Sequence, residues 1–444
     1  MSRSIRIQGP GSINGAANVP GDKSISHRVA MLASVANGAS TIRGFATSAD
    51  CRATLDCVER LGVGVDRKSD TLIIHGGGLN GYRPAETRVS LYAGNSGSTM
   101  RMLSGLLAAQ RFTSVLDGDE SLRRRPMARI IKPLTDMGAR ISARDATFAP
   151  LVIEGNRLKP IEYASRVASA QVKTCILFAG LYADGRTVFT EPARSRNHTE
   201  LMLKEFGARI EYDHTPSSSI TIEGGHELTP VNYQVPGDIS SAAFLVAAAA
   251  VLHESRLVIR DVNLNPSRSA FLEVLSALGA RIETRNVSQK HGEPMGDIHV
   301  VSGSLGSDGP VMKLTGESVP NIIDEVPILA VIGTQVEGRI EVRDAGELRI
   351  KESDRIRTIV DGVRALGGEI EEFEDGFAVA GPQRLTGGRV ETAGDHRIAM
   401  AFSIAGLIAE GTTEIVDADC AAVSFPEFYD LLNTLSGGDH VIWL

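Results

Sequence analysis

Five segments of the chain combine cations, carboxylates and small residues in spacings that suit anionic ligands. They are residues 20–28, 93–101, 117–127, 169–173 with 194–198, and 324–325 with 349–357 and 395–397. In the first, Lys23, Ser24 and Arg28 are expected at a helix start, where backbone N–H groups and cationic side chains make an anion site. The alternative is that Asp22 or Ser24 merely caps the helix beside solvated basic residues. His27 is expected to be structural.

A Gly-rich turn and an arginine-rich loop form the second and third segments. Asn95 and Gly97 lie in a turn that opens an apolar helix over 102–109, so a phosphate or carboxylate can approach the backbone closely. Ordinary helix capping explains these residues equally well, and the turn lacks the Gly-Lys-Ser/Thr of a P-loop. In the loop, Arg125 is the candidate for a bidentate phosphate clamp, whereas the two preceding arginines are expected to be solvated.

The fourth segment joins a helix start to a basic loop. Ser169, Ala170 and Gln171 begin a predicted helix, where hydroxyl and amide groups can hydrogen-bond a polyol or a phosphate. Arg196 adds positive charge from the loop. A plain helix cap is at least as good an explanation of these residues.

The fifth segment places carboxylates beside cations. Lys351, Glu352 and Arg355 fall at i, i+1 and i+4, so on a helix Lys351 and Arg355 share a face and Glu352 lies about 100° round. The alternative is an ordinary ion-paired helix. With Asp324 and Arg397, this segment offers two carboxylates for proton transfer, at Asp324 and Glu352. All five segments together suit two multiply charged anions with acid–base chemistry between them.

These segments are carried by an internal repeat. A helix, a strand, a second helix and a Gly-Ala-Arg-Ile phrase or its relative recur, followed by a hairpin whose second strand ends in glycine. The phrase begins at Gly62, Gly138, Gly207, Gly279 and Gly367. The hairpin glycines, which are expected to mark turns, are Gly76, Gly155, Gly224, Gly303 and Gly381. A sixth unit fits the remaining tail, which predicts six βαβαββ units.

The two chain ends are predicted to share one unit. The sixth copy lacks its second hairpin strand, and residues 4–9 have the form of that strand; an unrelated strand is the alternative. Val-Pro-Gly-Asp occurs at 19–22 and again at 235–238, with three units between the copies and three after. We therefore expect an N-terminal domain over 20–235 and a similar C-terminal domain over 1–19 and 236–444, with ligands in the cleft between them.

Composition restricts the class of protein. A chain of 444 residues that is 42% hydrophobic is expected to form two to four globular domains. The net charge of -8 and the 5% aromatic content disfavour nucleic acid and anionic membranes as partners. Four cysteines without CxxC spacing predict buried thiols in a reducing compartment and no structural zinc. Without a signal-peptide pattern or a membrane-spanning run, a soluble cytoplasmic protein is expected.

Nine motifs resemble, in order, those of the 5-enolpyruvylshikimate-3-phosphate synthase family. They are PGDKSISHR, GNSGSTMR, RRRPM, ASAQVK, RNHTE, DEVPILA, RIKESDRI, DHRIAMA and SFPEF. The Ser-Ala-Gln at 169–171 is similar to the class II bacterial enzymes, since class I enzymes have Ser-Ser-Gln. The resemblance implies an α/β fold of two inverted domains, each of three repeats, which close around the substrates. It implies no metal and no organic cofactor.

The resemblance also implies an activity and a site. The family transfers the enolpyruvyl (1-carboxyvinyl) group of phosphoenolpyruvate to the 5-hydroxyl of shikimate 3-phosphate and releases phosphate, on the way to chorismate and aromatic amino acids. The residues implied for shikimate 3-phosphate are Lys23, Ser24, Arg28, Ser169, Ala170, Gln171, Arg196, Asp324 and Lys351. Those implied for phosphoenolpyruvate are Lys23, Asn95, Gly97, Arg125, Gln171, Glu352, Arg355 and Arg397.

Three residues are implied to carry the protons of the family's addition–elimination mechanism. Asp324, with Lys23, relieves the 5-hydroxyl of its proton. Glu352 protonates the methylene carbon and then helps to take a proton back as phosphate leaves. How these steps divide among the three residues stays open.

Two positions depart from family patterns. Class I enzymes have a lysine before the last Thr-Phe-Pro, whereas Val423 precedes Ser-Phe-Pro in this chain; Arg397 and Lys23 are then expected to bear more of the charge. Class II enzymes that are insensitive to glyphosate can carry alanine in the Gly-rich turn, where this chain has Gly97. Glyphosate is therefore an expected inhibitor, and a monomer is the expected state.

Three other functions fit the sequence less well. The enolpyruvyl transferase that acts on UDP-N-acetylglucosamine is expected to carry a reactive cysteine before its Arg-Pro, and residues 114–126 contain none. A nucleic-acid end-processing protein of related fold would need a basic face and a nucleophilic histidine. A repeat scaffold without catalysis would show its conspicuous residues in every copy, whereas these occur once each.

Overall fold

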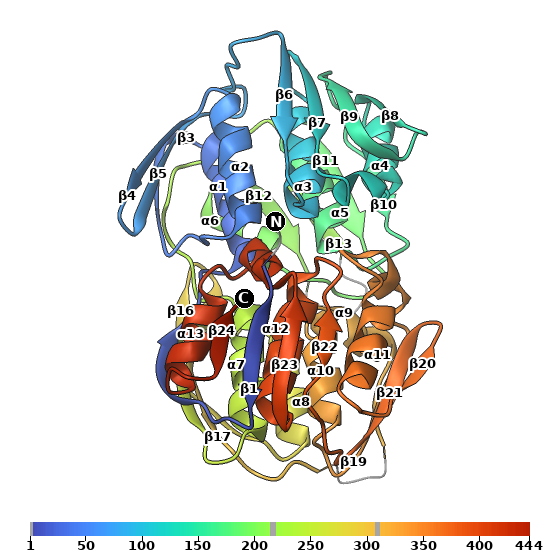
Figure 1. Cartoon of the computed structure of the whole chain (residues 1–444). Coiled ribbons are helices and arrows are strands. Elements are labelled where there is room, and N and C mark those ends of the chain that lie inside the picture. Colours follow the sequence, from blue (N-terminus) through green and yellow to red (C-terminus); the bar gives the residue numbers. More distant parts are fainter. Residues whose placement is uncertain (1–2, 214–218, 307–310) are drawn as a thin grey trace. The chain divides into compact units, whose positions relative to one another are not determined.

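The chain divides into two compact units. The computed structural model describes residues 3–213, 219–306 and 311–444. Unit 1 comprises Met1–Pro20, Pro236–Ser288 and Pro294–Leu444, and unit 2 comprises Gly21–Val235 and Gln289–Glu293. Figure 1 follows the chain through both units by colour.

Each unit holds three four-stranded sheets of one topology, in which an edge strand runs parallel to its neighbour and the next strand runs antiparallel. The unit 2 sheets, in spatial order, are β14 (Asn232–Gln234), β3 (Asn37–Arg43), β5 (Thr71–Gly77) and β4 (Gly64–Lys68); β6 (Arg88–Tyr92), β7 (Thr113–Asp117), β9 (Phe148–Glu154) and β8 (Arg140–Arg144); and β10 (Glu162–Ala164), β11 (Arg186–Thr190), β13 (Ser219–Glu223) and β12 (Arg209–Tyr212). The unit 1 sheets are β16 (Arg281–Lys290), β17 (Glu293–Val301), β15 (Arg256–Asn263) and β2 (Asn14–Asn18); β18 (Met312–Leu314), β19 (Gly338–Val342), β21 (Gly376–Gly381) and β20 (Glu371–Phe373); and β22 (Arg389–Glu391), β23 (Gly411–Val416), β1 (Ile5–Gly9) and β24 (Val441–Trp443). The predicted α/β repeat is confirmed.

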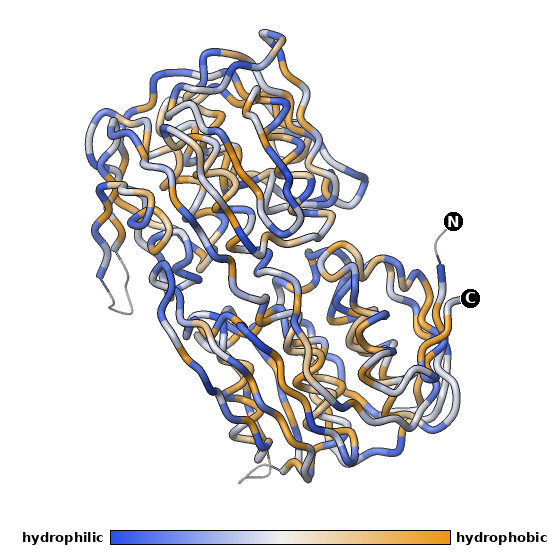
Figure 2. The backbone as a smooth tube through the Cα atoms, turned by 90° about the vertical axis from the view of Figure 1, so that its left-hand side faces the viewer, coloured by the Kyte–Doolittle hydropathy of each residue, from blue (hydrophilic) through white to orange (hydrophobic). Residues whose placement is uncertain are grey.

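Buried helices form the centre of each unit. They are α1 (Lys23–Val35), α3 (Gly97–Leu107) and α5 (Ala170–Gly180) in unit 2, and α7 (Ile239–Val251), α10 (Val326–Gly333) and α12 (His396–Ile408) in unit 1. The remaining helices are α2 (Ala49–Arg60), α4 (Ala128–Asp136), α6 (His198–Glu205), α8 (Ala270–Ala277), α9 (Val319–Ile322), α11 (Arg355–Ala365) and α13 (Phe428–Leu435), with short 3-10 turns η1 (Leu122–Arg124), η2 (Gly316–Ser318), η3 (Gly346–Ile350) and η4 (Ala418–Val423). Most residues of these central helices are buried, and the partly exposed ones lie mainly near the helix N-termini. Figure 2 shows hydrophobic colour concentrated inside each unit and hydrophilic colour mainly on its outer loops.

The N-terminal strand completes the last sheet, as predicted. β1 lies between β23 and β24, with Ile5 opposite both Ile415 and Trp443. Figures 1 and 2 show the two ends of the described chain side by side. Two other strands belong to a different unit from the helix that follows them in the chain. Strand β2 pairs with β15 of unit 1 although it precedes α1 of unit 2, and β14 pairs with β3 of unit 2 although it precedes α7 of unit 1. The chain therefore changes unit between a strand and its helix.

The glycine of the repeated phrase ends a helix in every copy. The five predicted glycines have φ of 78–103° and directly follow the C-caps of α2, α4, α6, α8 and α11. Gly437 does the same after α13, with φ of 96°. In all six, the next residue donates its N–H to the carbonyl five residues earlier, at 2.8–3.4 Å. This left-handed cap strongly favours glycine.

The hairpin glycines have a different cause from the one predicted. A Cβ on Gly76, Gly155, Gly224 or Gly381 would lie 1.3–2.7 Å from a backbone carbonyl oxygen near the end of the same repeat's first helix, and Gly9 would clash likewise. These residues mark a close approach between strand and helix, so the prediction that they mark turns is wrong. Gly303 is the exception, because its Cβ would meet only the Arg281 side chain, at 3.4 Å.

Candidate active site

Helix α1 of unit 2 begins at Lys23. Asp22 caps it by accepting a hydrogen bond from the Ile25 N–H at 2.9 Å. The Lys23 Nζ lies 3.1 Å from Asp50 Oδ2, and 17% of the lysine side chain is exposed. The ammonium group thus stays partly accessible at a helix N-terminus, where it can meet an anion.

Arg28 is buried and connects α1 to α5 and α6. Its Nε donates to Thr199 Oγ1 at 2.7 Å, its Nη2 to Thr174 Oγ1 at 3.0 Å and its Nη1 to the Ser24 carbonyl at 2.8 Å. Arg196 Nη1 lies 3.4 Å from Ser24 Oγ. Two guanidinium groups therefore meet at Ser24, an arrangement that suits a phosphate.

Helix α3 begins at Gly97 with Ser96 as its N-cap. Asn95 precedes the cap and bridges two charged groups. Its Nδ2 donates to Asp119 Oδ2, and its Oδ1 accepts from Arg125 Nη2, both at 2.7 Å. Arg125 is only 7% exposed, so the predicted clamp arginine does differ from its two solvated neighbours, which form ion pairs with carboxylates at the surface.

Helix α5 starts at Ala170, after the N-cap Ser169. The Gln171 side chain connects this start to α3. Its Nε2 donates to Ser98 Oγ at 3.0 Å, and its Oε1 accepts from Arg101 Nη1 at 2.8 Å. The structure thus brings together the predicted residues of the second and fourth segments.

Arg101 is a site residue that the sequence prediction does not include. A Cβ on Gly97 would lie 2.8 Å from Arg101 Nη1 and 3.6 Å from Arg125 Nη1. Both guanidinium groups therefore border the first residue of α3. The signal for Arg101 is its spacing, because four residues after Gly97 places it on the same helix face.

His27 belongs to a buried chain of hydrogen bonds. Its Nδ1 lies 2.7 Å from Thr54 Oγ1, which lies 2.7 Å from Thr99 Oγ1, and Thr99 donates to Ser96 Oγ at 2.8 Å. Burial, helped by the neighbouring Lys23 charge, holds the pKa of His27 well below its usual value. A neutral, structural histidine follows, as predicted, and the chain fixes the N-cap of α3 relative to α1.

A second buried cluster holds the loop that carries Arg196. The Lys173 Nζ lies 3.0 Å from Glu191 Oε1 and 2.8 Å from Glu200 Oε1, with none of the lysine side chain exposed. Glu191 also accepts from the backbone N–H and the hydroxyl of Ser195, at 3.0 and 2.6 Å. The loop is therefore attached to α5 through a fully buried ion pair.

Unit 1 gathers carboxylates around two buried guanidinium groups. Arg355 donates from Nε to Asp395 Oδ2 at 2.7 Å and from Nη2 to Glu352 Oε2 at 2.5 Å, while its Nη1 lies 3.7 Å from Asp324 Oδ1. Arg397 Nη2 lies 3.4 Å from Asp324 Oδ2, and its Nη1 donates to the Asp324 carbonyl at 2.8 Å. Both candidate proton-transfer groups thus share Arg355.

The prediction that Lys351 and Arg355 share one face of a helix is wrong. η3 ends at Ile350, and α11 begins at Arg355 with Asp354 as N-cap. Lys351 and Glu352 lie in the bent link between them, because the Asp354 side chain starts the helix by accepting from the Arg357 N–H. Partial burial lowers the pKa of Lys351.

The residue after Asp324, Glu325, is a buried carboxylate with a partner on another element. Glu325 is 2% exposed and accepts a hydrogen bond from the Ser240 hydroxyl, which also accepts from Arg268 Nη2 at 2.6 Å. Burial, together with the adjacent Asp324 charge, raises the pKa of Glu325. Local spacing could not reveal this contact, since Ser240 is 85 residues away in the chain.

Both units therefore present cationic side chains at helix N-termini, and unit 1 adds two carboxylates on shared guanidinium groups. These features are typical of an α/β enzyme with anionic substrates and acid–base chemistry. The model of the family "EPSP synthase (3-phosphoshikimate 1-carboxyvinyltransferase)" matches residues 7–432. The chain belongs to the EPSP synthase family, whose activity is 3-phosphoshikimate 1-carboxyvinyl transfer in aromatic amino acid biosynthesis.

Individual relatives agree over nearly their whole length. The 3-phosphoshikimate 1-carboxyvinyltransferase of Solibacter usitatus is 49% identical, over 97% of this chain and 99% of its own. The Bacillus subtilis enzyme of that name is 44% identical, over 96% and 98%. The solved EPSP synthase of Acinetobacter baumannii is 39% identical and superposes with a TM-score of 0.87 over 100% of both chains.

In residues 3–213, 219–306 and 311–444, no helix is long and apolar enough to cross a membrane. In the same part of the chain, no group of three His, Cys, Asp or Glu side chains is placed to hold a metal ion.

Proposed function

We propose that the two sets of residues bind the two substrates of the carboxyvinyl transfer. The set for shikimate 3-phosphate is Lys23, Ser24, Arg28, Ser169, Ala170, Gln171, Arg196, Asp324 and Lys351. The set for phosphoenolpyruvate is Lys23, Asn95, Gly97, Arg125, Gln171, Glu352, Arg355 and Arg397. The meeting of Arg28 and Arg196 at Ser24 supports the first set, and the contact of Arg125 with Asn95 supports the second.

One observation carries the proposed chemistry, namely the shared hold of Arg355 on Asp324 and Glu352. In the addition step, the 5-hydroxyl oxygen of shikimate 3-phosphate bonds to C2 of phosphoenolpyruvate. Its proton passes to Asp324, with Lys23 assisting, while C3 accepts a proton from Glu352. In the elimination step, C3 returns a proton to Glu352 and the C2–O bond to phosphate breaks. The departing phosphate takes up the proton that Asp324 received, so Asp324 and Glu352 return to their starting states. The products are enolpyruvylshikimate 3-phosphate and phosphate.

Arg355 links the binding of phosphoenolpyruvate to the protonation state of Glu352. Glu352 accepts a charge-assisted hydrogen bond from its Nη2 at 2.5 Å, which favours the ionised carboxylate. A phosphate or carboxylate of phosphoenolpyruvate at Arg355 would compete for the same guanidinium group. Its arrival weakens the hold on Glu352 and favours the protonated form that C3 needs. Asp324 keeps Arg397 as a partner and stays ready to accept a proton.

Three finer features belong to the same proposal. Glyphosate inhibits the enzyme, because hydrogen at Gly97 leaves room beside Arg101 and Arg125 for a ligand longer than phosphoenolpyruvate. The enzyme acts as a monomer, with no cofactor. It works in the cytoplasm, where three of its four cysteines are buried thiols and Cys420 is partly buried.

Glu352→Gln and Asp324→Ala test the proton-transfer roles. Each is expected to lower kcat by at least about 100-fold, the usual range for a positioned acid or base, with little change in thermal midpoint. Glu347→Gln is the matched control, since it removes a nearby carboxylate that lies 3.8 Å from Lys351 and has no role in the mechanism. Turnover within threefold of wild type in either test variant would refute that residue's role.

A further inference from the structure

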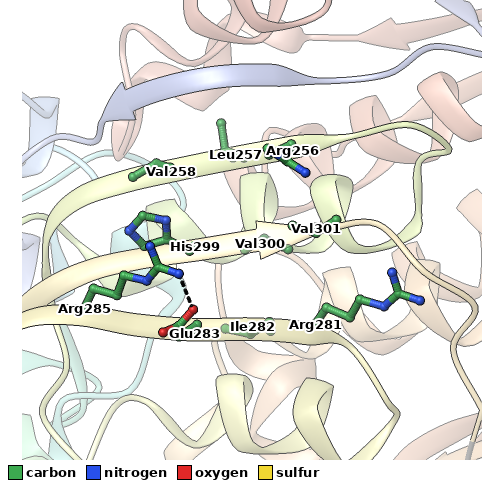
Figure 3. Close-up of a pocket in the computed structure, with 10 residues that line it drawn as sticks. All are labelled: Arg256, Leu257, Val258, Arg281, Ile282, Glu283, Arg285, His299, Val300 and Val301. Atoms are coloured by element: carbon green, nitrogen blue, oxygen red, sulfur yellow. Dashed lines mark hydrogen bonds and ion pairs between the residues drawn. The ribbon is translucent and has the colours of Figure 1, made fainter.

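An arginine-lined groove lies on one sheet of unit 1, and none of the residues that line it belongs to the proposed active site. Its volume is about 580 Å³, and it is formed by β15, β16 and β17. Figure 3 shows the side chains of Arg256, Arg281, Arg285 and His299 along it. A groove of this size suits a small molecule.

Among the residues that the structure describes, two of these arginines have no carboxylate partner. Arg285 forms an ion pair with Glu283 at 2.6 Å, and this hydrogen bond lowers the pKa of Glu283. Arg256 and Arg281 form no ion pair with any other residue in the described part of the chain, and both are exposed. With three arginines and one glutamate, the groove walls carry an excess of positive charge in a chain whose net charge is -8.

The sheet of the preceding repeat has a glutamate that pairs with the equivalent arginine, and the groove sheet lacks it. There Arg186 pairs with Glu211 at 2.6 Å, and Arg209 pairs with Glu223 at 3.0 Å. Glu223 lies opposite both arginines in the register of β13. Arg186 and Arg209 are therefore each paired with a neighbouring carboxylate.

Val301 replaces Glu223 in the groove. Arg256 lies opposite Val301, as Arg186 lies opposite Glu223. Arg281 corresponds to Arg209 as the third residue of the Gly-Ala-Arg-Ile phrase. The exchange of one glutamate for valine thus leaves two arginines on either side of an apolar residue.

The groove chemistry defines its ligand class. Arginine binds phosphate and carboxylate through paired N–H groups. Arg256 and Arg281 stand two strands apart, or roughly 10 Å between their Cα atoms, a distance that their long side chains can close on one multivalent anion. Val258 and Val301 supply an apolar floor between them. We propose that this groove is a second anion site, for a small phosphorylated molecule with a carbon skeleton.

Calorimetric titration with pyrophosphate tests the proposal on the full chain in a buffer free of phosphate. The expected wild-type result is two classes of sites, since the active-site residues also bind anions. Val301→Glu restores the carboxylate found in the preceding repeat and is expected to remove one class, with at least a tenfold loss of affinity there. Arg281→Ala is expected to give the same loss without introducing a charge.

The controls separate this site from the active site and from general charge effects. Arg186→Ala removes a paired arginine at the equivalent position and is expected to leave both classes intact. Carboxyvinyl transfer by Val301→Glu is expected to stay at the wild-type rate, and binding is the readout, so the result does not depend on the proposed mechanism. Identical titrations for wild type, Val301→Glu and Arg281→Ala would overturn the proposal. An equal loss in Arg186→Ala would do so as well, because it would assign binding to net charge.

Discussion

The substitution Gly97→Ala separates ligand fit from folding at the start of α3. The new Cβ would lie 2.8 Å from Arg101 Nη1, so this guanidinium group must retreat by about half an ångström to reach ordinary van der Waals contact. The movement lengthens its 2.8 Å hydrogen bond to Gln171. Because a hydrogen bond to a charged group contributes about 1.5–3 kcal/mol, we expect glyphosate to bind at least about tenfold more weakly.

Folding is expected to change little. Alanine favours a helix over glycine by about 1 kcal/mol, which offsets the displacement of a flexible arginine end. The assay is steady-state phosphate release, with glyphosate varied against phosphoenolpyruvate, alongside thermal unfolding. A smaller rise is expected in the KM of phosphoenolpyruvate, since it is shorter than glyphosate. Gly64→Ala is the control, because its Cβ makes only ordinary contact at 3.4 Å on an exposed strand. Equal inhibition constants for wild type and Gly97→Ala would refute the reasoning.

Three further predictions concern packing and charge. Lys173→Met leaves two buried glutamates without their cation, so chemical denaturation should show a stability loss of about 3–5 kcal/mol; a loss below about 1 kcal/mol would contradict the ion-pair argument. Gly155→Ala would place a Cβ 1.3 Å from the Gln110 carbonyl oxygen and should prevent stable folding, whereas Gly303→Ala should keep the wild-type thermal midpoint; similar midpoints for both variants would refute the close-approach explanation. Burial lowers the pKa of Lys351 from 10.5, so its charge is lost at lower pH than that of an exposed lysine, and kcat/KM for shikimate 3-phosphate should fall on that alkaline side. Lys351→Arg should move this fall to higher pH, and an unmoved profile would exclude the lysine as its source.

The sequence predicts those features of the fold that each repeat encodes locally. A glycine one residue after a helix cap can be recognised because the same phrase recurs, and the β1 strand can be placed because its form matches the missing strand of the last copy. The sequence correctly identifies the positions of the hairpin glycines, but it wrongly assigns them to turns. Their need arises from a helix end that packs against the strand, and no pattern within the strand records that contact.

In the candidate site too, the features encoded by neighbouring residues are predictable, and the long-range contacts are not. Helix starts at Lys23 and Ala170 are readable from capping residues and apolar runs. The predicted start of the next helix at residue 102 is wrong, because Ser96 caps α3 and the helix begins at Gly97. The i, i+4 spacing of Lys351 predicts a helix that the Asp354 cap begins too late to include. The sequence does not reveal the partners of the key charges, since they lie on other elements well beyond one helical turn: Asp50 is 27 residues from Lys23, and Asp395 is 40 residues from Arg355.

Phosphate release from phosphoenolpyruvate is the sharpest test of carboxyvinyl transfer by this chain. The purified chain should release phosphate when shikimate 3-phosphate is present, with one enolpyruvyl ether formed per phosphate. It should release none with phosphoenolpyruvate alone or with UDP-N-acetylglucosamine as the acceptor. Absence of release with shikimate 3-phosphate, or equal release with the sugar nucleotide, would contradict the account.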